Sequence, residues 1–389
     1  MTAKPLPAYV IAARRTALGR VGGLHRSRRL EELSAPLVSA VLRDAKVDAG
    51  RVDELILGNT TAGGNPARLV ALAAGLPETV SALTVDRQCG SGLDAILLAI
   101  GHVGAGDCEI AVAGGAESVS TAPWRIAKPR SLYQTPHFIS LEPAVTDPFD
   151  GVPFEAAEAL ALRLGIGRGR QDAWVLKSHA RAEKAREDRR FVGEILPLRS
   201  TADEARDQSA VDPTPGDVER ERPFAPPTGT LTPANTSTPH DGAAFVLVVS
   251  EAVWSELGRP PALRLIASAT QGVGAEDEAA APAAAMKKLY GRLNGFDRSA
   301  IRTIEIGETS AAQALALAEA MELDADSLNP AGGGVVRGHP LGATGAVLVV
   351  RLFTDLVREH DGSSRYGAVV QGTFGGLGIA ALFEAVGRN

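Results

Sequence analysis

Cys89 is the first side chain in this sequence whose type and setting could support covalent chemistry. It lies in Thr84-Val-Asp-Arg-Gln-Cys-Gly-Ser-Gly-Leu-Asp, between an expected strand and a glycine-rich helix start. A thiol at a helix N-terminus experiences the positive end of the helix dipole, which can lower its pKa from about 8.5 toward 7 or below. This segment alone leaves a buried structural cysteine as an equal alternative. Cys108, at the entry to another strand, is predicted to be structural.

His339 is the second such side chain. It lies in Gly338-His-Pro-Leu-Gly-Ala-Thr-Gly, a tight loop in which Pro340 and the glycines restrict the backbone. An imidazole has the right pKa range for proton transfer near neutrality. Taken without Cys89, a loop histidine that makes a structural hydrogen bond is the more common interpretation.

Short apolar runs alternate with amphipathic stretches, a rhythm that predicts a parallel or mixed α/β sheet covered by helices. The expected strands are 9–13, 54–58, 83–86, 109–113, 243–249, 263–270, 303–306, 367–371 and 379–384. The expected helices are 30–45, 65–75, 92–104, 170–188, 311–321 and 344–358.

Length and pattern together predict two similar α/β halves with an insertion. A chain of 389 residues exceeds the roughly 250–300 residues at which one hydrophobic core stops growing. Residues 118–240 are rich in proline, arginine and polar residues, and Asp147–Pro153 and Arg222–Pro233 cannot be regular elements. We therefore expect an N-terminal half over 1–117 and 241–262, an inserted loop domain over 118–240, and a C-terminal half over 263–389.

The bulk composition excludes several classes of protein. A net charge of −6 argues against a general nucleic-acid binder. Two cysteines form neither a disulfide scaffold nor, without other ligands, a zinc site, so no metal is expected. The N-terminal segment lacks the apolar stretch of a secretory signal, and no window approaches the ~20 apolar residues of a membrane span. We expect a soluble cytoplasmic protein.

The segment around Cys89 resembles the nucleophile segment of thiolases, and the likeness extends over nearly the whole chain. The similar segments are AARRTALGRVGG (12–23), NPARLVALAAGLP (65–77), AGGAESVSTAPW (113–124), RQDAWVLKSHARA (170–182), GTLTPANTSTPHDGAA (229–244) and SLNPAGGGVVRGHPLGATGA (327–346). The resemblance implies the layered αβαβα thiolase fold and assembly as a homodimer or homotetramer. It also implies a coenzyme A thioester as substrate, no permanently bound cofactor, and His339 as the group that deprotonates Cys89.

Two positions depart from the pattern of thiolases that make or cleave carbon–carbon bonds. Counting back from Gly378, the position of their second cysteine holds Gly372. Gly307 stands where an asparagine usually orients a water in one oxyanion hole, although the adjacent Glu308 is kept. Loss of one oxyanion donor can cost ~2.7–4 kcal/mol in the barrier. Ordinary Claisen condensation and thiolysis should therefore be impaired, and Thr373, Ser310, Glu308 and His240 are candidate replacements for the missing proton carrier.

Other site residues follow from the resemblance alone. The backbone N–H groups of Cys89 and Phe374 match the second oxyanion hole of the family. His179, Asn235 and Ser237 match positions near the pantetheine and nucleotide, while Arg220 and Arg222 could meet phosphates or form a solvated charge run.

The sequence thus predicts a thiolase-like acyltransferase that forms an acyl-enzyme on Cys89. The alternative is a catalytically degenerate thiolase fold that serves as a binding or assembly subunit, for example one that braces a small partner protein. The vacated positions Gly307 and Gly372 are the reason to keep that alternative.

Overall fold

The strands form one long mixed sheet in two halves. In the computed structural model, which describes residues 6–139, 154–199, 201–208, 214–359 and 365–387, the strand order is β10-β11-β12-β9-β1-β8-β5-β3-β4. The first half comprises β1 (Ala8–Arg15), β3 (Glu54–Gly58), β4 (Ser81–Val85), β5 (Ile110–Glu117) and β8 (His240–Ser250), with β2 (Gly19–Arg20) beside β8. The second half comprises β9 (Ala262–Gly272), β10 (Ile301–Gly307), β11 (Tyr366–Thr373) and β12 (Leu377–Val386). The halves join where β1 pairs with β9.

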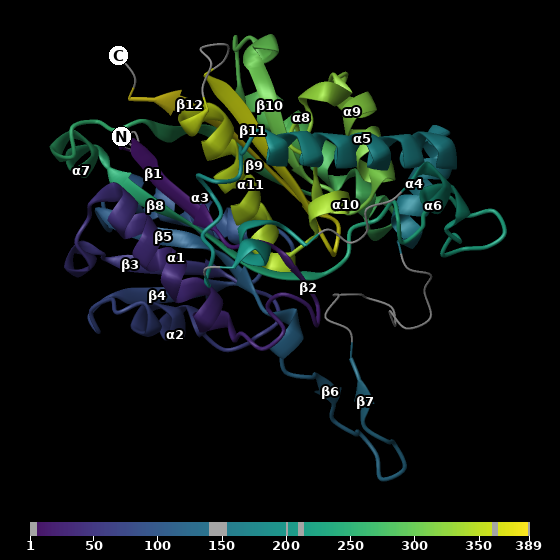
Figure 1. Ribbon diagram of the computed structural model, residues 1–389, viewed down its shortest axis with the longest axis horizontal. Helices are drawn as coiled ribbons and strands as arrows, with labels where there is room; N and C mark the ends of the chain where they lie inside the picture. Colours follow the sequence, from purple (N-terminus) through teal and green to yellow (C-terminus); the bar gives the residue numbers. More distant parts are fainter. Residues whose placement is uncertain (1–5, 140–153, 200, 209–213, 360–364, 388–389) are drawn as a thin grey trace.

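Helices lie between the two halves and outside each of them. α3 (Ser91–Ala105) and α11 (Thr344–Phe353, continued by a π-helical turn Thr354–Arg358) form the central layer and share one apolar core with both halves of the sheet. α1 (Leu30–Ala45) and α2 (Pro66–Ala73) cover the outer face of the first half. α8 (Ala281–Arg292) and α9 (Ala311–Met321) cover the outer face of the second, as Figure 1 shows. This is the αβαβα arrangement that the resemblance implied, so the predicted fold class is confirmed.

Glycines allow the two central helices to meet at their N-termini. A Cβ atom on Gly92 would lie 2.8 Å from the carbonyl oxygen of Gly342, and one on Gly345 would lie 2.6 Å from Cβ of Leu93. Both distances are too short for a side chain without a shift of the neighbours, which include backbone atoms. The close approach of α3 and α11 therefore depends on these glycines, and it places the segments before the two helices side by side.

The region between β5 and β8 contains further helices and a small hairpin. It contains β6 (Ile126–Ala127), β7 (His137–Phe138), α4 (Glu155–Leu164), α5 (Arg168–Glu187) and α6 (Pro215–Arg220), while α7 (Glu251–Glu256) and α10 (Gly334–Arg337) lie further along the chain. The expected irregular segment Asp147–Pro153 lies outside the described residues. The proposed domain boundaries stay a prediction. In the described part of the chain, no helix is both long and apolar enough to cross a membrane.

Candidate active site

Cys89 lies on a sharp turn between β4 and α3. Gln88 has a left-handed backbone with φ of 49°, and Ser91 holds the turn from inside. The Ser91 hydroxyl accepts a hydrogen bond from Arg87 N at 2.8 Å and donates one to the carbonyl oxygen of Gln88 at 2.6 Å. Cys89 is only 2% exposed. The turn thus presents the thiol at the helix start while the side chain stays buried.

His339 meets Cys89 from the other half of the chain. Its Nε2 lies 3.1 Å from Cys89 Sγ, and its Nδ1 lies 2.7 Å from the Thr344 hydroxyl. The backbone N–H of His339 donates to the carbonyl oxygen of Thr238 at 3.0 Å. The structure therefore brings together the two side chains that the sequence singled out, and it adds Thr344, which the sequence analysis had not considered. Thr344 is the first residue of α11, and that position was its only signal.

Burial sets the resting protonation of this pair. It raises the pKa of Cys89 to about 12, outweighing the backbone N–H groups of Phe374 and Cys89, which lower it. The pKa of His339 is lowered to about 4, mainly by burial and secondarily by His240. This reverses the lowered thiol pKa expected from the helix dipole alone, because desolvation opposes the thiolate more strongly. At neutral pH the resting pair is thiol and neutral imidazole, with the imidazole proton on Nδ1 facing Thr344 if Nε2 accepts from the thiol.

Two backbone donors converge on the sulfur. The N–H groups of Phe374 and of Cys89 itself both hydrogen-bond to Sγ. Phe374 has an ordinary φ, whereas the following Gly375 and Gly376 take φ of 86° and 73°. A phenylalanine therefore fits at this position without strain, since the left-handed residues of the turn are the glycines. The role of these two N–H groups as an oxyanion hole stays a prediction.

Glu117 is a buried carboxylate at the back of the site. It is fully buried and accepts hydrogen bonds from Thr60 N at 2.6 Å, Asn59 Nδ2 at 3.0 Å and Gly342 N at 3.2 Å. Burial raises its pKa to about 7, while those hydrogen bonds and one from Thr61 oppose the rise. Glu117 ties the ends of β3 and β5 to the loop that follows His339. The sequence analysis quoted its segment but gave the residue no role.

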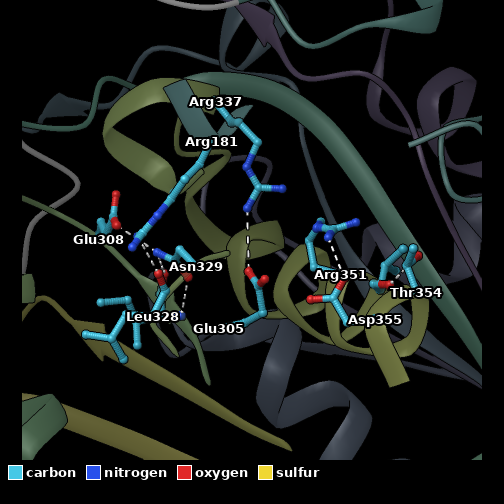
Figure 2. Close-up of polar contacts among 12 residues, drawn as sticks. Arg181, Glu305, Glu308, Leu328, Asn329, Arg337, Arg351, Thr354 and Asp355 are labelled. Carbon is cyan, nitrogen blue, oxygen red and sulfur yellow. Dashed lines mark hydrogen bonds and ion pairs between the residues drawn. The ribbon is translucent and has the colours of Figure 1, made fainter. Parts of the chain in front are cut away.

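Glu308 supports the segment that precedes His339. It is 1% exposed and accepts hydrogen bonds from Asn329 Nδ2 at 2.7 Å and Val335 N at 3.2 Å. Burial raises its pKa, and the contact with Asn329 is the largest opposing influence. Figure 2 shows Glu308 beside Asn329. With both oxygens engaged, Glu308 positions the backbone around α10 in this structure, and its predicted role as a proton carrier stays a prediction.

The position of the missing asparagine is occupied by another carboxamide. Gly307 and Gln371 are neighbours in the parallel pairing of β10 and β11. A Cβ atom on Gly307 would lie 1.9 Å from Gln371 Oε1, so no side chain fits there while Gln371 keeps its place. Gln371 is fully buried, and its Nε2 donates to the carbonyl oxygen of Gly372 at 2.6 Å. Sequence reasoning overlooked Gln371; its only signal was a polar residue inside an apolar strand.

The position of the missing cysteine is also enclosed. A Cβ atom on Gly372 would lie 3.0 Å from Pro282 Cγ and 3.1 Å from Gln313 Nε2. Gln313 is itself fixed, because its Oε1 accepts from Thr309 N at 3.1 Å and from the Thr309 hydroxyl at 2.9 Å. Among described residues, the side chains nearest to position 372 are therefore a proline and a neutral amide.

The other candidate proton carriers already have partners. The Ser310 hydroxyl caps α9 by accepting from Gln313 N at 3.1 Å, and the Thr373 hydroxyl donates to the carbonyl oxygen of Phe374 at 3.1 Å. Both ring nitrogens of His240 face carbonyl oxygens, those of Thr238 at 2.9 Å and Gln208 at 3.1 Å. Their backbone settings favour structural roles.

The predicted ligand-binding residues lie on the loop before β8 and on α5. Asn235 is fully buried, and its carboxamide bonds to Thr230 and Thr232, so it shapes the loop before β8. Ser237 is 8% exposed and its backbone N–H donates to the carbonyl oxygen of Thr309. His179 is half-buried on α5. Their roles in binding coenzyme A stay a prediction. Within the described residues, no cluster of His, Cys, Asp or Glu could hold a metal ion.

Comparison with known proteins agrees with this geometry. The family model for the thiolase N-terminal domain matches residues 8–252, and that for the thiolase C-terminal domain matches residues 260–385. A Bacillus subtilis protein provisionally named acetyl-CoA C-acetyltransferase YhfS is 36% identical over 97% of this chain and 99% of its own length. A Staphylococcus aureus protein with the same provisional activity, VraB, is 35% identical over 97% and 98%.

A solved structure extends the likeness to three dimensions. The crystal structure of the Bacillus anthracis acetyl-CoA acetyltransferase superposes with a TM-score of 0.90 at 31% identity, over 99% of this chain and 100% of that one. Family models over both halves, relatives of matching length and a shared fold agree. The chain belongs to the thiolase family.

Proposed function

We propose that this protein is an acyltransferase that takes an acyl group from a coenzyme A thioester onto Cys89. One observation carries the proposal: the 3.1 Å contact between Cys89 Sγ and His339 Nε2, with two backbone N–H groups at the same sulfur. A nucleophile, a base within hydrogen-bond reach and a preformed pair of donors are the parts that acyl transfer needs.

The acylation step follows from the resting protonation of the pair. As the sulfur attacks the thioester carbonyl carbon, the thiol proton moves to His339 Nε2 and the carbonyl oxygen takes the negative charge. The N–H groups of Cys89 and Phe374 are available to that oxygen once the sulfur has formed its bond. The carbon–sulfur bond to coenzyme A then breaks, and the imidazolium returns its proton to the departing thiolate. The high thiol pKa means that the thiolate is produced only during the reaction, through His339.

Mass spectrometry tests acylation directly. Incubation with acetyl-CoA should add one acetyl group, located on the Cys89 peptide. Cys89→Ala should abolish the modification, whereas Cys108→Ser, which removes the other cysteine, should leave it intact. An unmodified Cys89 peptide in wild-type protein with a free thiol would refute the proposal.

We further propose that carbon–carbon bond formation and cleavage are slow. The enclosed glycines at 307 and 372 support this, because their surroundings contain amides and a proline rather than a second thiol. Thiolysis of acetoacetyl-CoA should fall well below the turnover of about 10 s⁻¹ typical of enzymes. A rate at or above that value would overturn this second proposal and leave the first intact.

A binding or assembly subunit is the second candidate function. The filled positions at Gly307 and Gly372 favour it, since they fit a chain that keeps the fold and loses the second half-reaction. Saturable binding of coenzyme A together with an unacylated Cys89 would support this candidate. Stoichiometric acetylation would exclude it.

We propose that the protein assembles as a homodimer or homotetramer. The connection between β6 and β7 exposes large apolar side chains, with Leu132 98% and Tyr133 97% exposed. Contiguous apolar surface of this kind commonly marks a protein interface. Light scattering on the purified protein should give a mass of two or four chains, and a monomer would contradict the proposal.

A further inference from the structure

Arg337, two residues before His339 in the chain, borders a cavity lined by arginines. Its volume is about 220 Å³, compared with about 30 Å³ for one water molecule in the liquid. Its walls come from β2, the C-terminal part of α5, the segment 206–208 and α10. The charged side chains that line it are Arg20, Arg186, Arg206, Arg337, Glu183 and Asp207. Neither Cys89 nor His339 is among its lining residues.

The positive charge of this cavity exceeds the negative charge. Both carboxylates of the wall already have arginine partners. Asp207 accepts a bidentate pair of hydrogen bonds from the buried Arg15 at 2.6 and 3.0 Å, and Glu183 is paired with Arg186. Among the described residues, Arg206 has a long contact of 3.7 Å with Asp203, and its side chain is 59% exposed. The lining therefore presents guanidinium groups from four separate segments.

Arg337 is the inner member of this group and is poorly satisfied. Its side chain is 4% exposed, and its Nε and Nη1 atoms have no hydrogen-bond partner among the residues that the structure describes. Its one ion pair, from Nη2 to Glu305 Oε2, is long at 3.5 Å. Figure 2 shows Arg337 extending toward Glu305. Burial lowers the pKa of Arg337, and Glu305 is the largest influence that opposes this.

The neighbouring Arg351 is more closely paired than Arg337, although its Nε also has no hydrogen-bond partner among the described residues. It is fully buried, and it forms ion pairs with Glu194 at 2.5 Å and with Asp355 at 2.7 Å. Arg337 has no comparable pair, although a buried charge is costly unless it is both paired and hydrogen-bonded. Nε and Nη1 have no exposed surface in this structure, so a ligand in the cavity would reach them after a rotation of the guanidinium and would then supply the partner that the described residues do not.

We propose that this cavity is a binding site for a phosphate-type dianion, held by Arg337 from inside and by Arg20 and Arg206 from the exposed side. Guanidinium groups match phosphate oxygens through paired N–H donors. A tetrahedral anion also presents oxygens in several directions, which suits donors from separate segments better than a planar carboxylate does.

The site lies next to the machinery that holds His339. Gln208, in the cavity wall, contributes the carbonyl oxygen that contacts His240 Nε2 at 3.1 Å. The His240 backbone N–H in turn donates to the carbonyl oxygen of His339 at 3.0 Å. Arg337 is two residues before His339 in the chain. An occupant here therefore contacts the support of the base rather than the acyl group on Cys89.

Inorganic phosphate is the probe for a direct test. Full-length protein would be titrated by calorimetry at constant ionic strength, with thermal unfolding as a second readout. Wild-type protein should bind phosphate saturably in the millimolar range or tighter and unfold at a higher temperature with phosphate than with chloride. Cys89→Ala should bind equally, since the site does not use the nucleophile. An absence of saturable binding to wild-type protein would overturn the proposal.

Arginine variants locate the site. Arg337→Met keeps the apolar stem and should weaken phosphate binding by about tenfold or more, the loss of one charge-assisted contact. Because this variant also leaves Glu305 unpaired and could fold poorly, Arg206→Ala serves as the second variant and should weaken binding several-fold with little change in stability. Arg51→Ala, which removes an exposed arginine paired with Glu256 outside the cavity, is the matched control. Equal phosphate affinity in wild type and Arg206→Ala, with Arg337→Met also unchanged if it folds, would refute the site.

A competition arm distinguishes the two sources of such a phosphate. If coenzyme A displaces inorganic phosphate competitively, the site receives a phosphate group of that substrate. If both bind together, the site receives a free phosphate or a separate phosphate ester. Either result supports the site provided that the arginine variants weaken the phosphate contact.

Discussion

The two sides of the active site differ in what they retain. The side built from the starts of α3 and α11 has a nucleophile, a base and a hydroxyl behind the base, linked in that order by hydrogen bonds, and the N–H groups of Cys89 and of Phe374, in the turn after β11, reach the sulfur. The side built from the ends of β10 and β11 has two glycines where the family pattern has functional side chains, with Gln371, Pro282 and Gln313 packed against them. The first side has the groups that acylation needs, which makes it the complete side. The second, repacked side has other side chains packed against its two glycines.

Under the proposed function, acylation and the later transfer of the acyl group would therefore rest on separable parts of the fold. The first side is assembled by contacts between helix starts, and these do not involve positions 307 or 372. The second side depends on what projects from the ends of two neighbouring strands, where a one-residue exchange changes the chemistry without disturbing the sheet. Variants on the first side should therefore affect acylation, and variants on the second should affect stability and later steps.

The largest effect is expected at the base of the complete side. His339→Ala should lower the rate of Cys89 acylation about 10²–10⁴-fold, because no positioned group then accepts the thiol proton. Rapid-quench mass spectrometry with acetyl-CoA measures this rate. His102→Ala, which removes a histidine paired with Glu54, is the control. Acylation by His339→Ala at the wild-type rate would mean that the two sides do not differ as described.

A smaller effect is expected at the hydroxyl behind the base. Thr344→Val keeps the shape of the side chain and removes the partner of His339 Nδ1, so acylation should slow by about tenfold, the worth of one hydrogen bond of about 1.4 kcal/mol. Thr344→Ser should retain most of the rate, since it retains the hydroxyl. If Val and Ser variants behave alike, the hydroxyl does not orient the imidazole.

On the repacked side, the expected effect is on stability. Gly307→Asn forces a Cβ atom to within 1.9 Å of Gln371 Oε1, and such overpacking should lower the free energy of unfolding by about 1–3 kcal/mol. The double variant Gly307→Asn with Gln371→Ala should recover much of that loss. Urea denaturation measures both, with Gln371→Ala alone as the reference. A fully stable single variant would show that the glutamine moves aside at no cost.

A still smaller change is expected at the other glycine. Gly372→Cys introduces a Cβ atom at 3.0 Å from Pro282 Cγ and 3.1 Å from Gln313 Nε2, so neighbours must shift only by tenths of an ångström. Stability should change by about 1 kcal/mol or less, and thiolysis of acetoacetyl-CoA should not be restored in full because position 307 is still altered. Thiolysis by this single variant at a rate typical of enzymes would contradict that interpretation.

The smallest expected change is that of acylation with pH. Burial lowers the pKa of His339 to about 4 and raises that of Cys89 to about 12. The base is therefore in its competent neutral form throughout ordinary conditions. The single-turnover acylation rate should be flat from about pH 6 to about pH 9 and fall only as the pH approaches about 4, where protonated imidazole accumulates. A midpoint near 6.5 would indicate a solvated imidazole instead.

Much of the fold could be predicted because periodicity reports which face of an element is buried. The bounds of Leu30–Ala45, Glu54–Gly58 and Ala311–Met321 agree with the structure. The sequence analysis did not delimit α8 (Ala281–Arg292), whose early proline and run of alanines give a weak amphipathic pattern.

The site was predictable to the extent that single residue types carry chemistry. Cys89 and His339 were identified from their residue types and flanking segments, and the structure brings them into contact. The expected lowering of the Cys89 pKa was wrong in direction. A helix dipole can be inferred from the local sequence, whereas burial by the other half of the chain cannot. Gln371 was overlooked for the same reason, because its role comes from Gly307 on the neighbouring strand β10. Thr344 lies only five residues after His339, and its contact with Nδ1 depends on how the loop between them folds.

The glycine contact between α3 and α11 has a consequence for how the molecule acquires reactivity during synthesis. Cys89 belongs to the first part of the chain to be made, while the imidazole that activates it is 250 residues further on. A nascent or partly folded chain thus holds a thiol without its base, and base-assisted acylation becomes possible only once the later helix has docked against Gly92. Acylation by a coenzyme A thioester would accordingly report on completed folding, and a fragment that ends before Gly345 should remain unlabelled.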